Sequence, residues 1–521
     1  MAEGNAADEV MPRRQVLESL SGLLLVLFVA MISSTVVSIA LPRIIGSLNG
    51  TQTQYTWVVT ATLLTATAST PIWGKLADLF NKKTLVQVAI VVFVLGSMAA
   101  GFAQNAEQII AARAFQGLGV GGLQALVQVV IAAIIPPRER GRYNGYLGAV
   151  MAVATVGGPL LGGLIVDVSW LGWRWCFFVG VPIAVVAFTV LQKTLHLETI
   201  RRSNVYVDYA GAALIAVGVS ILLIWVSFVG SSFDWMSWQT AAMAGGGLVV
   251  LLVAVWVESR VPEPVVPLHI VRTRTTALAI IGSLAVGIAM FGGAVFLGQY
   301  FQIGRGYSPT QAGLLTIPLM AGVLVASTVS GQLISRTGVI KPYIVAGSVL
   351  LVIGFLGLGT IDHATSLVFV SAAMVLVGVG VGMTMQNLVL AVQNSVPLRD
   401  LGAASASVTF FRSLGGTIGV SVLGAVLAHR VTADLTAALG GHGLTTGGTT
   451  SALNLAALPP DIQQVVRQVY GDATAHIFLI SAAAGVVGVI AALLLKPITL
   501  RTTIDLEQVE QDQQVNDPIV G

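Results

Sequence analysis

The chain has 521 residues, of which 55% are hydrophobic and only 9% are charged, and its mean hydropathy is +0.88. This composition excludes a soluble globular protein, so we predict an all-α integral membrane protein. The single cysteine, Cys176, excludes an intramolecular disulfide and a cysteine-based metal cluster. The net charge of +3 is better explained by basic residues that fix membrane topology than by nucleic-acid binding, which we do not expect.

Apolar runs of roughly 20 residues, the length that crosses a bilayer as a helix, recur along the chain. We predict fourteen spans between a polar N-terminus, residues 1–18, and a disordered polar tail, residues 501–521. If the N-terminus is cytoplasmic, few basic residues of the connecting segments face outward: Arg43, Arg174, Arg305, Arg430 and Arg467. This bias follows the positive-inside rule and places both termini on the cytoplasmic side of the cell membrane.

A short charged segment, residues 74–85 (GKLADLFNKKTL), separates the second and third apolar runs. We expect it to form a gating loop whose functional residues are Gly74, Asp78, Lys82 and Lys83. Gly74 would let the backbone turn tightly, and Asp78 would accept hydrogen bonds at the positive N-terminal end of a helix near Gly402. An ordinary positively charged cytoplasmic loop is the alternative.

The loop resembles the signature that the major facilitator superfamily carries between its second and third spans. One signature glycine is replaced by Asn81. Because asparagine tolerates left-handed backbone better than most residues, we expect Asn81 to adopt that conformation.

The fourth run contains Arg113, a permanent charge that costs at least ~2.5 kcal/mol inside a span unless it is solvated or paired. Gln116, Gln124 and Gln128 fall on the same helical arc and form a polar stripe. We predict that these four residues face a cavity. The alternatives are that Arg113 binds backbone carbonyls structurally and that the glutamines pair with amides of other helices.

The fifth run contains GGPLLGG, in which small residues allow close helix contact and proline bends the span. We predict a packing seam made by Gly157, Gly158, Pro159, Gly162 and Gly163. Generic small-residue packing is the alternative.

An internal repeat divides the chain. Gly117, Gly119 and Gly121 recur as Gly378, Gly380 and Gly382, a spacing of 261 (378 minus 117) that also relates Gly141 to Gly402. The gating loop recurs more weakly in residues 331–341, where Ser335 replaces Asp78. We therefore predict two pseudo-symmetric six-helix halves, residues 19–200 and 272–500, joined by two inserted helices in residues 201–271.

The second half carries its own polar stripe. Gln386 and Gln393, with Asn387 and Asn394 beside them, lie on the repeat partner of the fourth span. Arg412 is a second charge inside a span, for which snorkelling to the surface is the alternative to a cavity position. We also assign Gln299 to the cavity. The role of the long outer segment, residues 430–472, cannot be read from its sequence.

Taken together and in order, these motifs resemble the fourteen-span drug:proton antiporters of the major facilitator superfamily over nearly the whole chain. The resemblance implies a monomeric exporter of small amphiphilic compounds that uses a proton gradient and alternating access, needs no cofactor or metal, and is surrounded by membrane lipids. It is not an enzyme, because its six histidines are scattered and none of its 23 acidic residues lies mid-span. Export of a lipid or lipid-linked metabolite, or weakly coupled facilitation, is the alternative.

One position departs from the family. The resemblance implies an aspartate on the first span that couples protons beside Arg113, but this chain has Ser33 there. We therefore expect neutral or anionic substrates rather than cations. Any proton-coupling group would be an acid or histidine at a span end, such as Glu107, Asp208 or Glu258.

Overall fold

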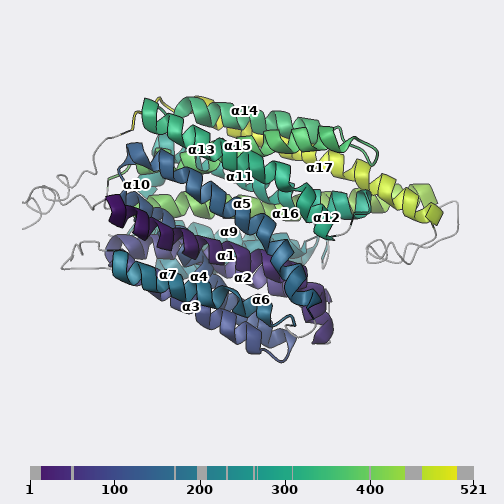
Figure 1. The fold of residues 1–521 in the computed structure, drawn as a ribbon, viewed down its shortest axis with the longest axis horizontal. Coiled ribbons are helices and arrows are strands. Elements are labelled where there is room, and N and C mark those ends of the chain that lie inside the picture. The colour runs from purple at the N-terminus through teal and green to yellow at the C-terminus, as the bar shows by residue number, and fades with distance from the viewer. Residues whose placement is uncertain are drawn as a thin grey trace, which may run out of the picture.

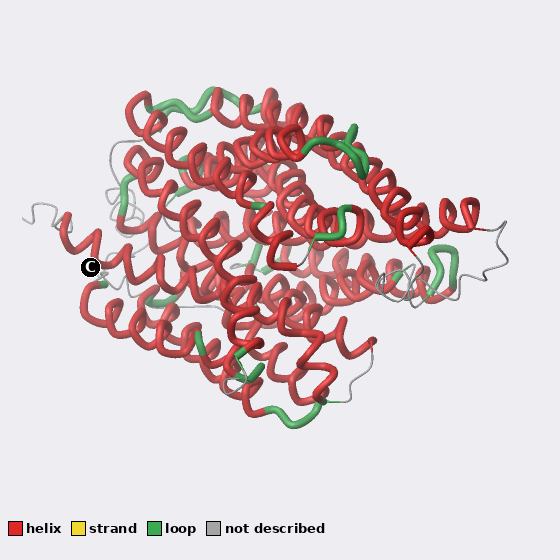
Figure 2. Tube along the Cα trace, turned by 45° about the vertical axis from the view of Figure 1, so that its right-hand side comes forward, coloured by secondary structure: helices red, strands yellow, loops and turns green. Residues whose placement is uncertain are grey.

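The computed structural model describes residues 13–48, 52–168, 172–195, 208–229, 233–261, 264–266, 268–307, 309–397, 400–439 and 460–500. Figure 2 shows that these residues are almost entirely helical, and their only β-structure is two isolated bridges. The prediction of an all-α fold is confirmed. The predicted tail, residues 501–521, and most of the predicted N-terminal segment lie outside the described residues.

The described residues of the N-terminal half form a bundle in which α6 and α7 together make one passage. Asn81 and Asn105 begin α3 and α4 because their side chains accept hydrogen bonds from unpaired backbone N–H groups. The helices are α1 (Arg13–Ser47), α2 (Gln52–Leu79), α3 (Lys82–Phe102), α4 (Ala106–Ile134), α5 (Pro137–Asp167), α6 (Trp175–Phe178) and α7 (Gly180–Thr194).

Two helices in the predicted insertion, α8 (Tyr209–Phe228) and α9 (Trp238–Glu258), pack against each other. The C-terminal half begins with the one-turn helix α10. Its elements are α10 (Leu268–Val271), α11 (Arg274–Gln299), the π-helix η1 (Tyr300–Gly304), α12 (Pro309–Leu315), α13 (Ile317–Thr337), α14 (Lys341–Leu358), α15 (Leu367–Gln393), α16 (Leu401–Leu439) and α17 (Pro460–Leu494).

Eleven helical stretches among the described residues are long and apolar enough to cross a membrane. Two helices are not among them: α2, which is rich in threonine, and α5, which begins with a charged turn. A third helix, α11, supplies a shorter apolar stretch. With these three helices, the arrangement is consistent with the predicted fourteen spans. The N-terminal half, purple and blue in Figure 1, lies beside the green and yellow C-terminal half.

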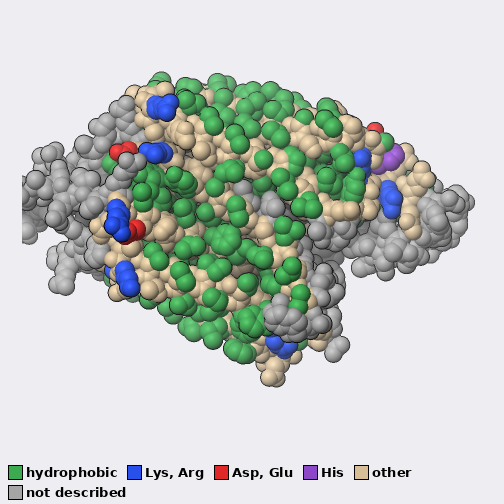
Figure 3. All heavy atoms as spheres, in the orientation of Figure 1, with side chains coloured by type: hydrophobic (Ala, Val, Ile, Leu, Met, Phe, Trp, Pro, Cys, Tyr) green, Lys and Arg blue, Asp and Glu red, His purple; other side chains and the backbone are tan. Residues whose placement is uncertain are grey.

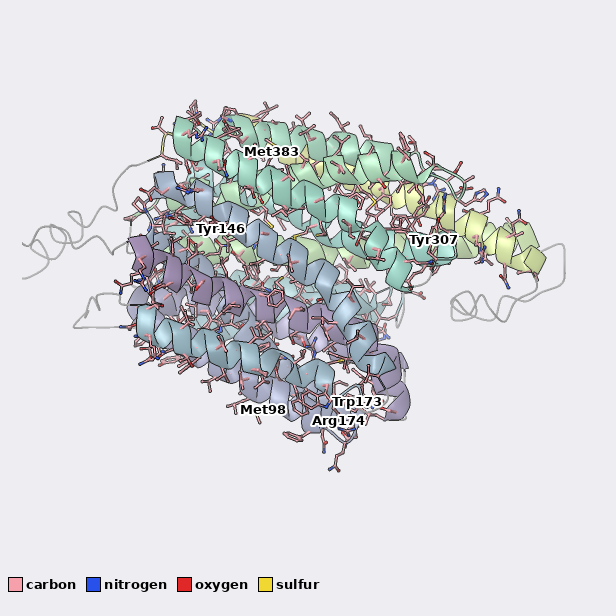
Figure 4. All side chains as sticks on the ribbon, in the orientation of Figure 1. Met98, Tyr146, Trp173, Arg174, Tyr307 and Met383 are labelled. Carbon is pink, nitrogen blue, oxygen red and sulfur yellow. The ribbon has the colours of Figure 1, made fainter. Side chains whose placement is uncertain are left out.

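The two ends of the bundle differ in charge. We call the end that holds the first residues of α1, with Arg14, Lys193, Lys341 and Lys496, the basic end. Figure 3 shows hydrophobic side chains over the middle of one face and Lys and Arg near the ends. At the opposite end, the Arg174 guanidinium lies 4.4 Å from the centroid of a Trp173 ring (Figure 4).

Two segments can now be described further. In the segment 430–472, α16 continues to Leu439 and α17 begins at Pro460, and the residues between these two helices lie outside the described part of the chain. The inserted α8 lies across both halves, since it packs against α2 and α16. Its residues Ile215 and Val219 share a buried apolar cluster with Ala68 of α2 and Phe410 of α16.

Candidate functional site

Asp78 ties the two halves together at the basic end. Its carboxylate accepts hydrogen bonds from the backbone N–H groups of Gly402, at 2.7 Å, and Ala403, at 2.8 Å. These groups belong to the first turn of α16, where a helix has unpaired donors and a partial positive charge. The expected position of Asp78 near Gly402 is confirmed.

Gly74 lies within α2 and not in a turn, so the expectation that it bends the backbone is wrong. A Cβ added to Gly74 would lie 2.2 Å from the Cβ of Ala406 and 2.8 Å from the carbonyl oxygen of Gly402. Glycine is required here because α2 and α16 approach each other backbone to backbone.

A second contact of this kind joins α5 to α13. A Cβ added to Gly141 would lie 2.5 Å from the carbonyl oxygen of Gly331. The Ser335 hydroxyl accepts a hydrogen bond from the backbone N–H of Arg142 at 2.9 Å. We call the first set the carboxylate contact (Gly74, Asp78, Gly402, Ala403) and the second the hydroxyl contact (Gly331, Ser335, Gly141, Arg142).

The lysines of the predicted gating loop do not reach across the halves in the same way. The Lys83 ammonium donates to the Gln192 carbonyl of α7, in its own half, at 2.7 Å. Lys82 lies close enough to Asp78 to interact with its charge. Asn81 has an extended backbone, with φ −61° and ψ 115°, so the expected left-handed conformation is wrong. Asparagine serves instead as the N-cap of α3.

Arg113 belongs to a buried hydrogen-bond network within the N-terminal half. Its Nη1 donates to Gln116 Oε1 at 2.6 Å, and its Nε donates to the Val58 carbonyl at 3.4 Å. Gln116 Nε2 donates to the hydroxyls of Ser33, at 3.1 Å, and Ser97, at 2.6 Å. Ser33 is therefore linked to Arg113 through a single amide, and no hydrogen bond or ion pair joins Arg113 to an acid in the described part of the chain.

The two predicted polar stripes meet between the halves. Gln128 Nε2 on α4 donates to Gln386 Oε1 on α15 at 2.9 Å, and Gln393 Nε2 donates to the Ser405 hydroxyl at 3.0 Å. In this conformation the amide-pairing alternative holds for Gln128. Arg140, which was not among the predicted site residues, is buried and donates to Gln393 Oε1 at 3.2 Å. It also donates to carbonyls at the C-terminal end of α4.

Five residues assigned to the cavity do not line the central cavity: Ser33, Arg113, Gln116, Asn387 and Gln299. The first three belong to the buried network around Arg113. Asn387 Nδ2 donates to the carbonyl of Met383, one turn earlier on α15; Met383 is labelled in Figure 4. Gln299 is the last residue of α11, at the opposite end of the bundle. Asn387 follows the cavity-lining Gln386 by one residue, so its side chain points about 100° away from the cavity. Gln299 lies several helical turns from the cavity along α11.

The central cavity has a volume of about 30 Å³ and is enclosed by α1, α4 and α5 of one half and α11, α15 and α16 of the other. Its lining residues are Leu27, Met31, Gln124, Gln128, Met151, Met290, Met385, Gln386, Arg412 and Ser413. A cavity of this size accommodates water molecules only.

The methionines of this cavity were missed by sequence reasoning. They come from α1, α5, α11 and α15, so no spacing along the chain marks them as a group. Methionine is unbranched and polarisable, and it adapts to apolar ligands of different shape. With the glutamines, these side chains give the cavity a lining that is apolar with a few polar amide groups.

Arg412 lines the same cavity and is buried, with 8% of its surface exposed. The snorkelling alternative is therefore wrong. Its Nη1 is fully buried and has no hydrogen-bond partner among the described residues. Arg113, by contrast, does not line the cavity.

The GGPLLGG segment packs inside the N-terminal half. A Cβ added to Gly158 would lie 1.9 Å from Thr35 Oγ1 on α1, and that hydroxyl donates to the Ala154 carbonyl at 3.1 Å. Gly162 is buried and Gly157 faces open space, while the side chain of Pro159 and the surroundings of Gly163 are not described. The observed seam joins α1 to α5, whereas the contact of α5 with the other half uses Gly141.

Two buried carboxylates meet at the basic end of the inserted helices. Asp208 Oδ1 accepts from the Gly211 N–H at 2.8 Å, and the Glu258 oxygens accept from the N–H groups of Val265 and Val266. A Cβ added to Gly211 would lie 2.2 Å from Asp208 Oδ2 and 2.5 Å from Glu258 Oε1, so both acids face this glycine.

Of these acids, Asp208 and Glu258 have 3% and 4% of their surface exposed, and Asp208 Oδ2 has no partner among the described residues. Lys75 of α2 lies close enough to Glu258 to interact with its charge. Glu107, the third acid considered for coupling, is exposed.

Comparison with known proteins agrees with this architecture. The model of the Major Facilitator Superfamily matches residues 23–420. An uncharacterised MFS-type transporter of Mycobacterium tuberculosis is 35% identical over 472 residues, which cover 91% of this chain and 68% of the relative. The multidrug transporter protein MdtP of Bacillus subtilis is 35% identical over 412 residues, which cover 79% of this chain and 75% of the relative.

Among solved structures, the proton:xylose symporter XylE has the same fold, with a TM-score of 0.61 and 14% sequence identity over 95% of this chain and 99% of XylE. Because the family model spans most of the chain, this protein belongs to the major facilitator superfamily.

Proposed function

We propose that this transporter exports small amphiphilic compounds by alternating access, driven by proton entry. The observation that carries the proposal is the central cavity, in which four methionines and three glutamines from both halves surround a nearly closed space. Adaptable thioethers suit apolar bodies of varied shape, and amides suit a polar substituent. The name of the Bacillus subtilis relative, a multidrug transporter, supports the same assignment.

For the proton-linked step, we propose the pair formed by Asp208 and Glu258. We choose this pair because both carboxylates are buried and face the same glycine, Gly211. The pair lies beside Lys75 on α2, the helix that also carries Asp78. Protonation there can therefore bias the carboxylate contact.

The test is transport in oriented proteoliposomes with and without a pH gradient. The probes are a neutral dye (Nile red), an anionic one (11-(dansylamino)undecanoic acid) and a cationic one (ethidium). We expect accumulation of at least one dye that stops when nigericin collapses the gradient. Rates that do not depend on the gradient would indicate a facilitator, and movement of labelled phospholipid alone would indicate a lipid exporter.

The double variant Asp208→Asn/Glu258→Gln tests the coupling pair. It should retain transport down a concentration gradient and lose accumulation against one. Glu107→Gln, an exposed acid, serves as the matched control. Full gradient-driven accumulation in the double variant would exclude the pair.

A further inference from the structure

The central cavity contains an arginine, Arg412, whose charge is not balanced by any of the residues that line the cavity. Arg412 Nη1 is buried without a hydrogen-bond partner among the described residues, and no acidic side chain lines the cavity. A buried guanidinium donor without a partner is costly, as is an unpaired charge within a span. Such a group is explained when a bound ligand supplies the missing hydrogen-bond acceptor and the opposite charge.

The neighbours of Arg412 are suited to an anion. Ser413, beside it on α16, offers a hydroxyl donor, and Gln124 of α4 offers an amide donor across the cavity. Arg113, the other arginine within a span, is engaged with Gln116 and lies outside the lining. The arginine available to bind an anion is therefore Arg412 of the C-terminal half, whereas the sequence analysis considered Arg113 of the N-terminal half.

We propose that Arg412 binds an anionic group of the substrate, so that the transported class is amphiphiles with an apolar body and a carboxylate or comparable anionic group. This inference rests on the proposed export function and names its substrate class. Guanidinium binds carboxylate through paired, charge-assisted hydrogen bonds, and the methionines Met31, Met151, Met290 and Met385 receive the apolar body.

The test uses three ligands that share one fluorophore and one chain: 11-(dansylamino)undecanoic acid, its methyl ester and the corresponding terminal amine. Binding to the purified full-length protein is followed by dansyl fluorescence. The wild type should bind the acid about tenfold more tightly than the ester, and the amine most weakly. Because the ester occupies the same cavity, the acid-to-ester ratio is insensitive to a general loss of folded protein.

Arg412→Gln should bring this ratio close to one, and Arg412→Lys should restore part of it. Arg14→Gln removes the same charge from a side chain that is 91% exposed and should leave the ratio unchanged. An unchanged ratio in Arg412→Gln, equal wild-type affinities, or no binding of any of the three would overturn the inference. Gradient-driven transport of a neutral or cationic dye would still support export, so the two proposals can fail separately.

Discussion

The carboxylate contact and the hydroxyl contact occupy equivalent places in the two repeats. In both, a glycine of one helix meets a glycine of the other half so closely that no Cβ fits. In both, a side chain one turn further on accepts a backbone hydrogen bond from the other half. The acceptors differ in charge: Asp78 brings a carboxylate that accepts from Gly402 and Ala403, whereas Ser335 brings a neutral hydroxyl that accepts from Arg142.

The inserted helices add to this difference. α8 packs against α2 and α16, the two helices of the carboxylate contact, and the Asp208 and Glu258 pair lies at that side of the basic end. The two contacts that close the basic end are therefore alike in their backbone packing but differ in charge. We infer that the carboxylate contact holds the basic end closed and that the hydroxyl contact mainly guides the helices together.

The largest effect should come from breaking the glycine packing that the two contacts share. Gly74→Val and Gly331→Val both place side-chain carbons where backbone atoms of the other half lie. Each should prevent closure of the basic end and reduce gradient-driven transport to background. Gly245→Val is the matched control, since an added Cβ there meets open space. Wild-type transport by either variant would show that the backbones need not meet.

A smaller and unequal effect is expected from removing the acceptors. Asp78→Asn loses the charge that strengthens its two bonds, at a cost of about 1–3 kcal/mol, whereas Ser335→Ala loses one neutral bond, at about 1 kcal/mol. The measurement is the distance between spin labels at Lys193 and Lys496, exposed at the basic end of each half. Asp78→Asn should shift the population toward the longer, open distance by roughly tenfold, and Ser335→Ala by less. Equal shifts would refute the asymmetry.

Much of this architecture could be predicted from the sequence because it follows from periodicity. Apolar run lengths predicted the membrane-spanning helices, the 261-residue repeat predicted the two halves, and the positive N-terminal end of the helix near Gly402 predicted the contact with Asp78. The predictions that inferred a backbone conformation from the type of residue alone were wrong. Gly74 is needed for close packing rather than a turn, and Asn81 caps a helix.

The cavity was harder to predict because it is assembled from single residues on six helices. Met31 and Met290 lie on different halves, and no motif surrounds either. Hydrogen bonding separated Arg412 from Arg113: both are buried charges inside spans, but Arg113 donates to Gln116, whereas Arg412 Nη1 has no partner among the described residues. Asp208 and Glu258 meet because α8 and α9 pair, which sequence spacing does not reveal.

The smallest effect should come from making the two contacts alike. Ser335→Asp places a carboxylate beside the Arg142 N–H, and a charged acceptor makes a stronger hydrogen bond than a neutral hydroxyl, by about 1 kcal/mol. Alone, the substitution should favour the closed basic end and slow transport by a few-fold, because opening then breaks two charged contacts. Combined with Asp78→Asn, it moves the charge from one side to the other and should restore part of the closed population in the same spin-label measurement. Ser335→Asn, nearly the same size without the charge, is the control. If Ser335→Asp opened the basic end further in the Asp78→Asn background, the two contacts would not be interchangeable, and the position beside the inserted helices would matter more than the charge.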